Sequence, residues 1–279
     1  MKPTRAPVFL LCILFSMACA RDGSAQPAEA PRPTGYKTVG EIPPPDGFVR
    51  GDVARGDFAG YLRDLPIKED NVLLLHTGKP KPNQTNHYAV VKMDVGNRDL
   101  QQCADAVIRL RAEWLWAGGK FKEIAFDFTS GDRFAWLDYA RGLRPKIAGR
   151  KVTWTKDGKR SSSRAAFRRY LDVIFMYAST RSLDKELTPV GSPEGIRAGD
   201  VLLQLKKPYG HAVIVLDTAK DPESGEVVFL LAQSYMPAQE IHVLRNPVDP
   251  EKSPWFSAWF GATLVTPEWT FDAKDLKRF

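Results

Sequence analysis

Cysteine and histidine are both scarce in this chain of 279 residues. It has three cysteines, and Cys103 is the only one outside the first 19 residues. A framework of intramolecular disulfides is therefore excluded for the rest of the chain. Of the four histidines, His76, His87 and His242 are scattered, with no close spacing to other His, Asp or Glu residues. We therefore expect neither a dedicated zinc site nor a cofactor.

Long apolar runs and nucleotide-binding motifs are also missing. Residues 8–17 (VFLLCILFSM) are apolar but too few to cross a bilayer as a helix. The sequence contains no Gly-rich phosphate loop, nucleic-acid module or internal repeat, so nucleic acid is not an expected partner. No feature specifies an oligomeric state.

The first 20 residues have the pattern of a signal peptide, with a basic start (MKPTR) before the apolar run. Two ends fit this signal. The small residues of Ala18-Cys19-Ala20 suit ordinary signal peptidase. Alternatively, Ser16-Met17-Ala18-Cys19 is a degraded lipobox, with Ser16 where Leu is usual, which would end the signal before Cys19 and attach the chain to a membrane through a lipid on Cys19. In both cases we expect an exported bacterial protein of the periplasm or outer envelope.

The remaining chain divides into two parts. Residues 21–38 are polar and Pro-rich and predict an extended linker. Residues 39–279 are long enough for a single α+β domain with a sizeable core, and 43% hydrophobic with 26% charged residues is typical of a globular chain. The net charge of +7 suits a protein facing anionic polymers or lipid headgroups.

Hydrophobic periodicity predicts a helix followed by antiparallel strands. Asp99 is the expected N-cap of a helix, with Gln102 at the capping-box position and an apolar stripe from Leu100 to Leu115. A second helix is expected over residues 164–177. The expected strands are residues 71–76, 88–94, 124–128, 200–205, 211–217, 227–233 and 240–244. This order is typical of an α+β fold.

Cys103 and His211 are the candidate catalytic pair. A thiol in the first turn of a helix is expected to have a lowered pKa, because backbone N–H groups and the helix dipole favour the thiolate. His211 opens the apolar strand HAVIV and would accept the proton, and Gln233 on the next strand would hold the imidazole ring. Ser234 and Gln239 are alternatives for that third role. Backbone N–H groups at Gln102 and Cys103 would stabilise an oxyanion, with a side-chain donor from Tyr88 or Gln101.

The run GDVLLQLKKPYGHAVIVLD resembles the central strand pair of NlpC-type cell-wall peptidases and CHAP amidases, which have papain-like folds. The resemblance implies an antiparallel sheet packed on a Cys-bearing helix, with Cys103, His211 and Gln233 in the three catalytic roles. Two departures stand out. Those families have Asp-Cys-Ser or a similar step at the nucleophile, where this chain reads Gln101-Gln102-Cys103-Ala104-Asp105. The segment between Cys103 and His211 is also long for those families.

A closer resemblance covers nearly the whole mature chain. The stretches NHYAVVKMDVGNRDLQQCADAVIRLRAEW, GDVLLQLKKPYGHAVIV and LAQSYMPAQEIHVL are similar to a family of exported bacterial proteins known only as a domain of unknown function. This resemblance implies a family but no activity.

Each candidate residue also has a structural explanation. Cys103 would pack in the helix stripe as a small hydrophobe, His211 would be a hydrogen-bonded histidine at a strand end, and Gln233 would cap backbone groups. Three functions follow. The first is a thiol hydrolase cleaving a peptide or amide bond, with peptidoglycan stem peptide as the default substrate. The others are a non-catalytic glycan- or peptide-binding protein on the same scaffold and a thiol acyltransferase.

Overall fold

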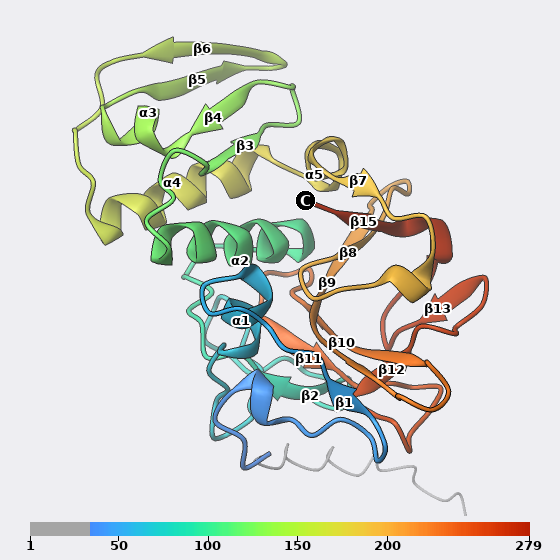
Figure 1. The fold of residues 1–279 in the computed structure, drawn as a ribbon. Coiled ribbons are helices and arrows are strands. Elements are labelled where there is room, and N and C mark those ends of the chain that lie inside the picture. Colours follow the sequence, from blue (N-terminus) through green and yellow to red (C-terminus); the bar gives the residue numbers. More distant parts are fainter. Residues whose placement is uncertain (1–33) are drawn as a thin grey trace, which may run out of the picture.

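The computed structural model describes residues 34–279 (Figure 1). The predicted signal peptide (1–20), the lipidation candidate Cys19 and most of the predicted linker (21–38) lie outside the described residues. Among the described helices, none is both long enough and apolar enough to cross a membrane.

One large antiparallel sheet organises the domain. Its main path runs β2-β11-β10-β9-β8-β15-β7, while β1 pairs with β9 and β12 pairs with β10. In this order the strands of the path span His87–Val90, His242–Leu244, Val227–Gln233, His211–Lys220, Val201–Gln204, Leu276–Arg278 and Thr188–Pro189. The two branch strands, β1 and β12, span Val49–Arg50 and Trp255–Ser257.

The central strands β9 and β10 are buried on both faces, which explains their nearly continuous apolar sequences. Successive side chains of a strand point to opposite faces. Accordingly, Ala212, Ile214 and Leu216 of β9 join the larger hydrophobic core, while Val213 and Val215 join a smaller core on the other face. The smaller core also receives the hairpin of β13 (Thr263–Val265) and β14 (Thr270–Asp272).

Helix α2 (Cys103–Ala117) packs on the larger core together with α1 (Phe58–Arg63) and α4 (Arg164–Tyr177). Residues 118–186, a large part of the long segment between Cys103 and His211, form a subassembly beyond α2, on the side away from the sheet (Figure 1). It contains α3 (Trp136–Ala140), α4, α5 (Thr180–Glu186) and two hairpins. The hairpins pair β3 (Ala125–Asp127) with β4 (Arg133–Ala135) and β5 (Arg144–Ala148) with β6 (Lys151–Thr155). Three short 3-10 helices span Val39–Glu41, Pro193–Gly195 and Ala273–Asp275.

Helix α2 begins later than the sequence predicts. Its N-cap is Gln102 rather than Asp99, so Cys103 is the first helical residue. The Asp99 carboxylate instead accepts hydrogen bonds from the backbone N–H of Ala238 (2.7 Å) and from Gln102 Nε2 (3.1 Å). Asp105 takes the capping role, since its Oδ2 accepts the N–H of Gln102 at 3.0 Å. The true start is therefore decided by a contact with a loop about 140 residues away.

The other predicted elements are largely confirmed, including α4 over residues 164–177 and β10 over residues 227–233. Residues 71–76 are the exception, because they form only isolated bridges, Leu74 with Pro80 and Leu75 with Gln239. The backbone of Leu73 is hydrogen-bonded by the side chain of Gln84 instead of by a neighbouring strand. An α+β domain with a large antiparallel sheet is confirmed.

Candidate functional site

Cys103 lies at a cleft of about 910 Å³. The cleft is bordered by the start of α2, by the end of α4 with α5, and by the loop between β8 and β9. The thiol side chain is partly exposed to it. The charged lining residues are Asp99, Asp105, Arg181, Asp184, Lys185, Lys206 and Lys207, and the exposed apolar ones are Met176, Leu205, Tyr209 and Met236.

The thiol faces the beginning of β9. Backbone N–H groups of Ala104, Ala212 and Cys103 itself lie near the sulfur and favour the thiolate. Burial and the neighbouring Asp105 carboxylate outweigh them, and together they raise the pKa of Cys103 to about 11. The predicted lowering of this pKa is therefore wrong. A helix start favours an anion only when the site is solvated or otherwise neutralised, and here desolvation is the larger effect.

His211 is the first residue of β9, only 2% exposed, and its Nε2 lies 2.8 Å from Oε1 of Gln233, the last residue of β10. Gly210, which lines the cleft, precedes it. A Cβ on Gly210 would lie 2.5 Å from the carbonyl oxygen of Gln204, so only glycine fits at this close approach. The Gly-His step of the sequence thus has a steric reason.

The hydrogen-bond network defines the tautomer of His211. Gln233 Nε2 lies 2.8 Å from Glu268 Oε2, and Glu268 Oε1 forms an ion pair with Lys81 Nζ at 2.6 Å. A carboxylate only accepts hydrogen bonds, so the amide nitrogen of Gln233 must face Glu268 and its oxygen must face His211. The proton of His211 is consequently on Nε2, which leaves the lone pair on Nδ1. An imidazole in this form can act as a base through Nδ1.

Aromatic rings surround the His211 imidazole. The ring centroids of Tyr235, Trp269 and Phe271 lie 4.8, 5.2 and 5.9 Å from it. Burial lowers the pKa of His211 to about 4, against a smaller opposing effect of the Gln233 hydrogen bond. The Tyr235 ring contacts His211, and burial, followed by the charges of Glu268 and Cys103, raises the pKa of Tyr235. At neutral pH the resting pair is therefore a neutral thiol and a neutral imidazole.

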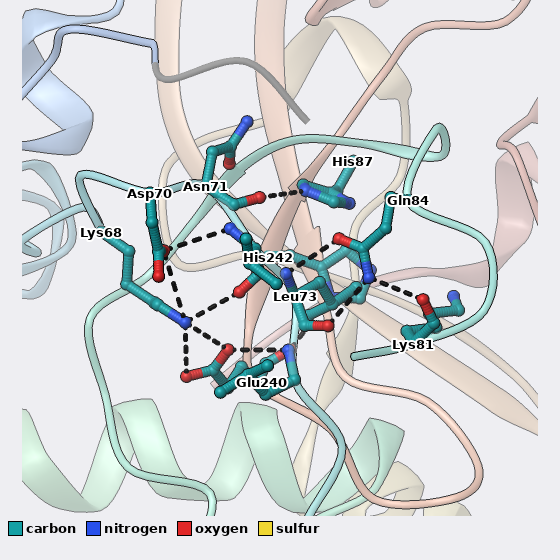
Figure 2. Close-up of polar contacts among 11 residues, drawn as sticks. Lys68, Asp70, Asn71, Leu73, Lys81, Gln84, His87, Glu240 and His242 are labelled. Carbon is teal, nitrogen blue, oxygen red and sulfur yellow. Dashed lines mark hydrogen bonds and ion pairs between the residues drawn. The ribbon is translucent and has the colours of Figure 1, made fainter. Parts of the chain in front are cut away.

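Two further histidines converge behind Gln233. His242 Nε2 accepts from Gln233 Nε2 at 3.3 Å, while its Nδ1 lies 2.9 Å from the carbonyl oxygen of Glu240. His87 Nε2 donates to the carbonyl of Asn71 at 2.9 Å, and the rings of His87 and His242 are 6.0 Å apart. Figure 2 shows this polar region, together with the nearby pair of Lys68 and Glu240. These histidines are far apart in the sequence, so their spacing did not predict that they lie close together.

No group of three His, Cys, Asp or Glu side chains that could hold a metal ion occurs within residues 34–279. Burial lowers the pKa of both His87 and His242, the latter to about 3. Both are neutral, and they serve here as hydrogen-bonding groups behind Gln233.

The remaining predicted site residues are placed as follows. Gln102 lines the cleft as the N-cap of α2, but its backbone N–H, a predicted oxyanion donor, already donates to Asp105 Oδ2. Tyr88 does not reach the cleft, because its ring stacks on Tyr36 and lies beneath Arg245. The side chain of Gln101 is buried and turned toward Arg109 Nη1 at 3.1 Å.

Ser234 and Gln239, the two alternatives to Gln233 for orienting the imidazole, do not contact His211. Ser234 Oγ contacts the carbonyl oxygens of Gln101 and Gln239, at 2.9 and 2.7 Å. The buried amide of Gln239 has no hydrogen-bond partner in the part of the chain that the structure describes. Gln233 alone of the three contacts His211.

The sequence did not predict three residues that contribute to the site, namely Glu268, Lys81 and Asp105. Glu268 and Lys81 lie in loops far from Cys103 in sequence, and no pattern around them indicates that they meet Gln233. The sequence did give a signal for Asp105. The NlpC-type families have an Asp directly before the nucleophile, whereas this chain has one two residues after Cys103. Its carboxyl is 7% exposed, and burial raises its pKa to about 8.

The assembled groups have the composition of a site for nucleophilic acyl transfer: a thiol, an oriented imidazole with a free lone pair, and backbone donors beside the sulfur. No curated protein and no solved structure matches this chain. One family does match, described as "Domain of unknown function (4846)", over residues 39–278. The matched region takes in α2, β9 and β10 and hence the whole site. The chain belongs to this family of unknown function.

Proposed function

We propose that this protein is an exported, papain-like thiol hydrolase of the bacterial envelope that cleaves a peptide or amide bond. Peptidoglycan stem peptide is the default substrate. Cys103 is the nucleophile, His211 the general base and acid, and Gln233 the residue that orients the imidazole. The backbone N–H groups of Cys103 and Ala212 are the oxyanion donors.

The observation that carries this proposal is the 2.8 Å contact of His211 Nε2 with Gln233 Oε1 at the beginning of β9, where the backbone N–H of the next residue, Ala212, lies near the Cys103 sulfur. Here an amide held by Glu268 directs the lone pair of Nδ1 away from Gln233. The open cleft at Cys103 supplies the access that a substrate needs.

The proposed reaction has two stages, acylation of the thiol and hydrolysis of the thioester. The Cys103 sulfur attacks the carbonyl carbon of the scissile bond while His211 Nδ1 takes the thiol proton. The resulting oxyanion is held by backbone N–H groups, and the tetrahedral intermediate collapses as His211 returns the proton to the leaving amine. A water molecule then attacks the thioester with His211 as base. This step releases the carboxylic acid and restores the thiol.

The neutral resting pair has a consequence for this mechanism. Since the pKa of Cys103 is raised to about 11 and that of His211 lowered to about 4, the thiolate forms during attack rather than before substrate binds. The enzyme would then use general-base catalysis, which is most effective when the developing charge is stabilised in the transition state.

The test is a screen of peptidoglycan fragments with the wild-type protein and a Cys103→Ser variant. We expect release of a new amine and a new carboxyl group from one fragment class by the wild type only, with equal thermal midpoints for both proteins. Trapping of an acyl group on Cys103, seen as a mass increase, would identify the thioester. Equal activity of the two proteins would contradict the proposal.

A second function, a non-catalytic binding protein on the same scaffold, is favoured by one observation. The raised pKa of Cys103 keeps its thiol protonated at neutral pH. In that case fragments would bind to the cleft without turnover, and Cys103→Ser would leave their Kd unchanged.

A further inference from the structure

Four cationic side chains line the cleft at Cys103. Arg181 and Lys185 come from α5, one turn apart on the same helix face, and Lys206 and Lys207 come from the loop that follows β8. All four are exposed, and none forms an ion pair within residues 34–279. By contrast, Arg50 and Arg63 are both paired with Asp217.

The carboxyl groups of the cleft do not cancel this charge. Asp184 forms an ion pair with Lys277. Asp105 is buried with a pKa raised to about 8, so it is largely uncharged at neutral pH. Asp99 is charged, but its carboxylate accepts hydrogen bonds from Gln102 and from the backbone of Ala238. The cleft therefore has an excess of positive charge that no ion pair neutralises.

Exposed apolar side chains gather in the same place. Nine large hydrophobic side chains are exposed on the described residues, and four of them line this cleft: Met176, Leu205, Tyr209 and Met236. Exposed apolar groups beside oriented polar ones are typical of a binding site. A ligand that suits this lining carries a negative charge and an apolar side chain.

We propose that the Cys103 cleft selects acidic peptides, with a free carboxylate close to the scissile bond and an apolar side chain beside it. This inference rests on the proposed function and specifies its substrate class. Guanidinium and ammonium groups are the usual partners of a carboxylate, and four of them without ion pairs raise the concentration of an anionic ligand in the cleft.

A pair of thiol reagents tests the charge preference without requiring turnover. Iodoacetate carries a carboxylate, while iodoacetamide has nearly the same size and no charge. The rate of each is measured for Cys103 in the full chain by mass spectrometry of its peptide. The ratio of the two rates is then divided by the ratio for the same protein unfolded in guanidinium chloride.

We expect this normalised ratio to favour iodoacetate roughly fivefold or more at low salt, and to fall toward one at high ionic strength. The double variants Lys206→Gln/Lys207→Gln and Arg181→Gln/Lys185→Gln should each lower it severalfold. The matched control Lys79→Gln/Lys122→Gln removes the same charge from two exposed lysines outside the cleft, and should leave the ratio unchanged.

The possible failures are distinct. A ratio near one in the wild type, or one that responds equally to the control variant, would overturn the acidic-substrate inference and leave the proposed hydrolase in place. If neither reagent labels Cys103 until the protein unfolds, the thiol is inaccessible, and both the proposed function and this inference are overturned.

Discussion

His211 Nε2 and Gln233 Oε1 lie 2.8 Å apart at the ends of two neighbouring strands, and this contact defines the candidate site. The direction of this hydrogen bond is determined by Glu268, which accepts a hydrogen bond from the nitrogen of the same Gln233 amide. A chain of four side chains thus runs from Lys81 through Glu268 and Gln233 to the imidazole.

Gln233→Leu should lower kcat about 100-fold with little change in KM, because His211 loses the acceptor that fixes its tautomer. The measurement is steady-state kinetics on the fragment identified by the screen. Gln239→Leu is the matched control, a buried glutamine with no described partner for its amide, and it should retain full activity. Equal losses in the two variants would mean that Gln233 has only a packing role.

Glu268→Gln should lower kcat about tenfold, since a neutral amide no longer dictates which end of Gln233 faces the imidazole. The spectroscopic readout is the nitrogen-15 chemical shifts of His211. We expect the signature of the Nε2–H tautomer in the wild type and a mixture in the variant. Lys68→Met breaks a nearby ion pair with Glu240 that does not touch Gln233, and it should change neither property (Figure 2).

Asp105→Asn should become more stable than the wild type as pH rises from about 5 to 8. Burial raises the folded pKa of Asp105 from 3.8 to about 8, so in this range the folded state holds a proton that the unfolded state has lost. Stability is then lost with rising pH, by about 1.4 kcal/mol per pH unit for one group. Asparagine has no such proton. Urea unfolding of both proteins at several pH values measures the difference, and a difference independent of pH would refute the assignment.

The same substitution should also lower the pKa of Cys103. Burial is the main cause of the raised value of about 11, and the Asp105 carboxylate is the next largest. Removing that charge should shift the midpoint of iodoacetamide labelling to lower pH, whereas the midpoint of the unfolded protein should stay the same. A midpoint that does not move would show that Asp105 does not act on the thiol.

Gly210→Ala should destabilise the domain by about 1–3 kcal/mol and reduce activity, because the added methyl group meets the carbonyl of Gln204 at the approach to His211. Gly51→Ala is the matched control, since nothing lies within 4 Å of a Cβ at that glycine. Denaturant midpoints and kcat report the two effects. Equal stability of the two variants would mean that the β8–β9 turn can relax.

Local patterns in the sequence were sufficient for most of the elements. The alternating and continuous apolar runs predicted β9 and β10, and the 3.6-residue stripe predicted α4, because these periodicities record which faces of a strand or helix are buried. The start of α2 was misplaced by three residues, since its N-cap is Gln102 and not Asp99. Asp99 has the right chemistry for an N-cap, but its carboxylate is engaged by the distant Ala238 N–H.

By itself, the sequence determined the scarcity of cysteine, the positions of Cys103 and His211 at the starts of a helix and a strand, and the α+β order. Only the tertiary structure decided that Gln233, rather than Ser234 or Gln239, meets His211, and that Glu268 and Lys81 stand behind it. It also decided that the thiol and imidazole are neutral at rest. Strand register, burial and hydrogen-bond direction arise from packing between residues far apart in the chain, and periodicity along the chain does not encode them.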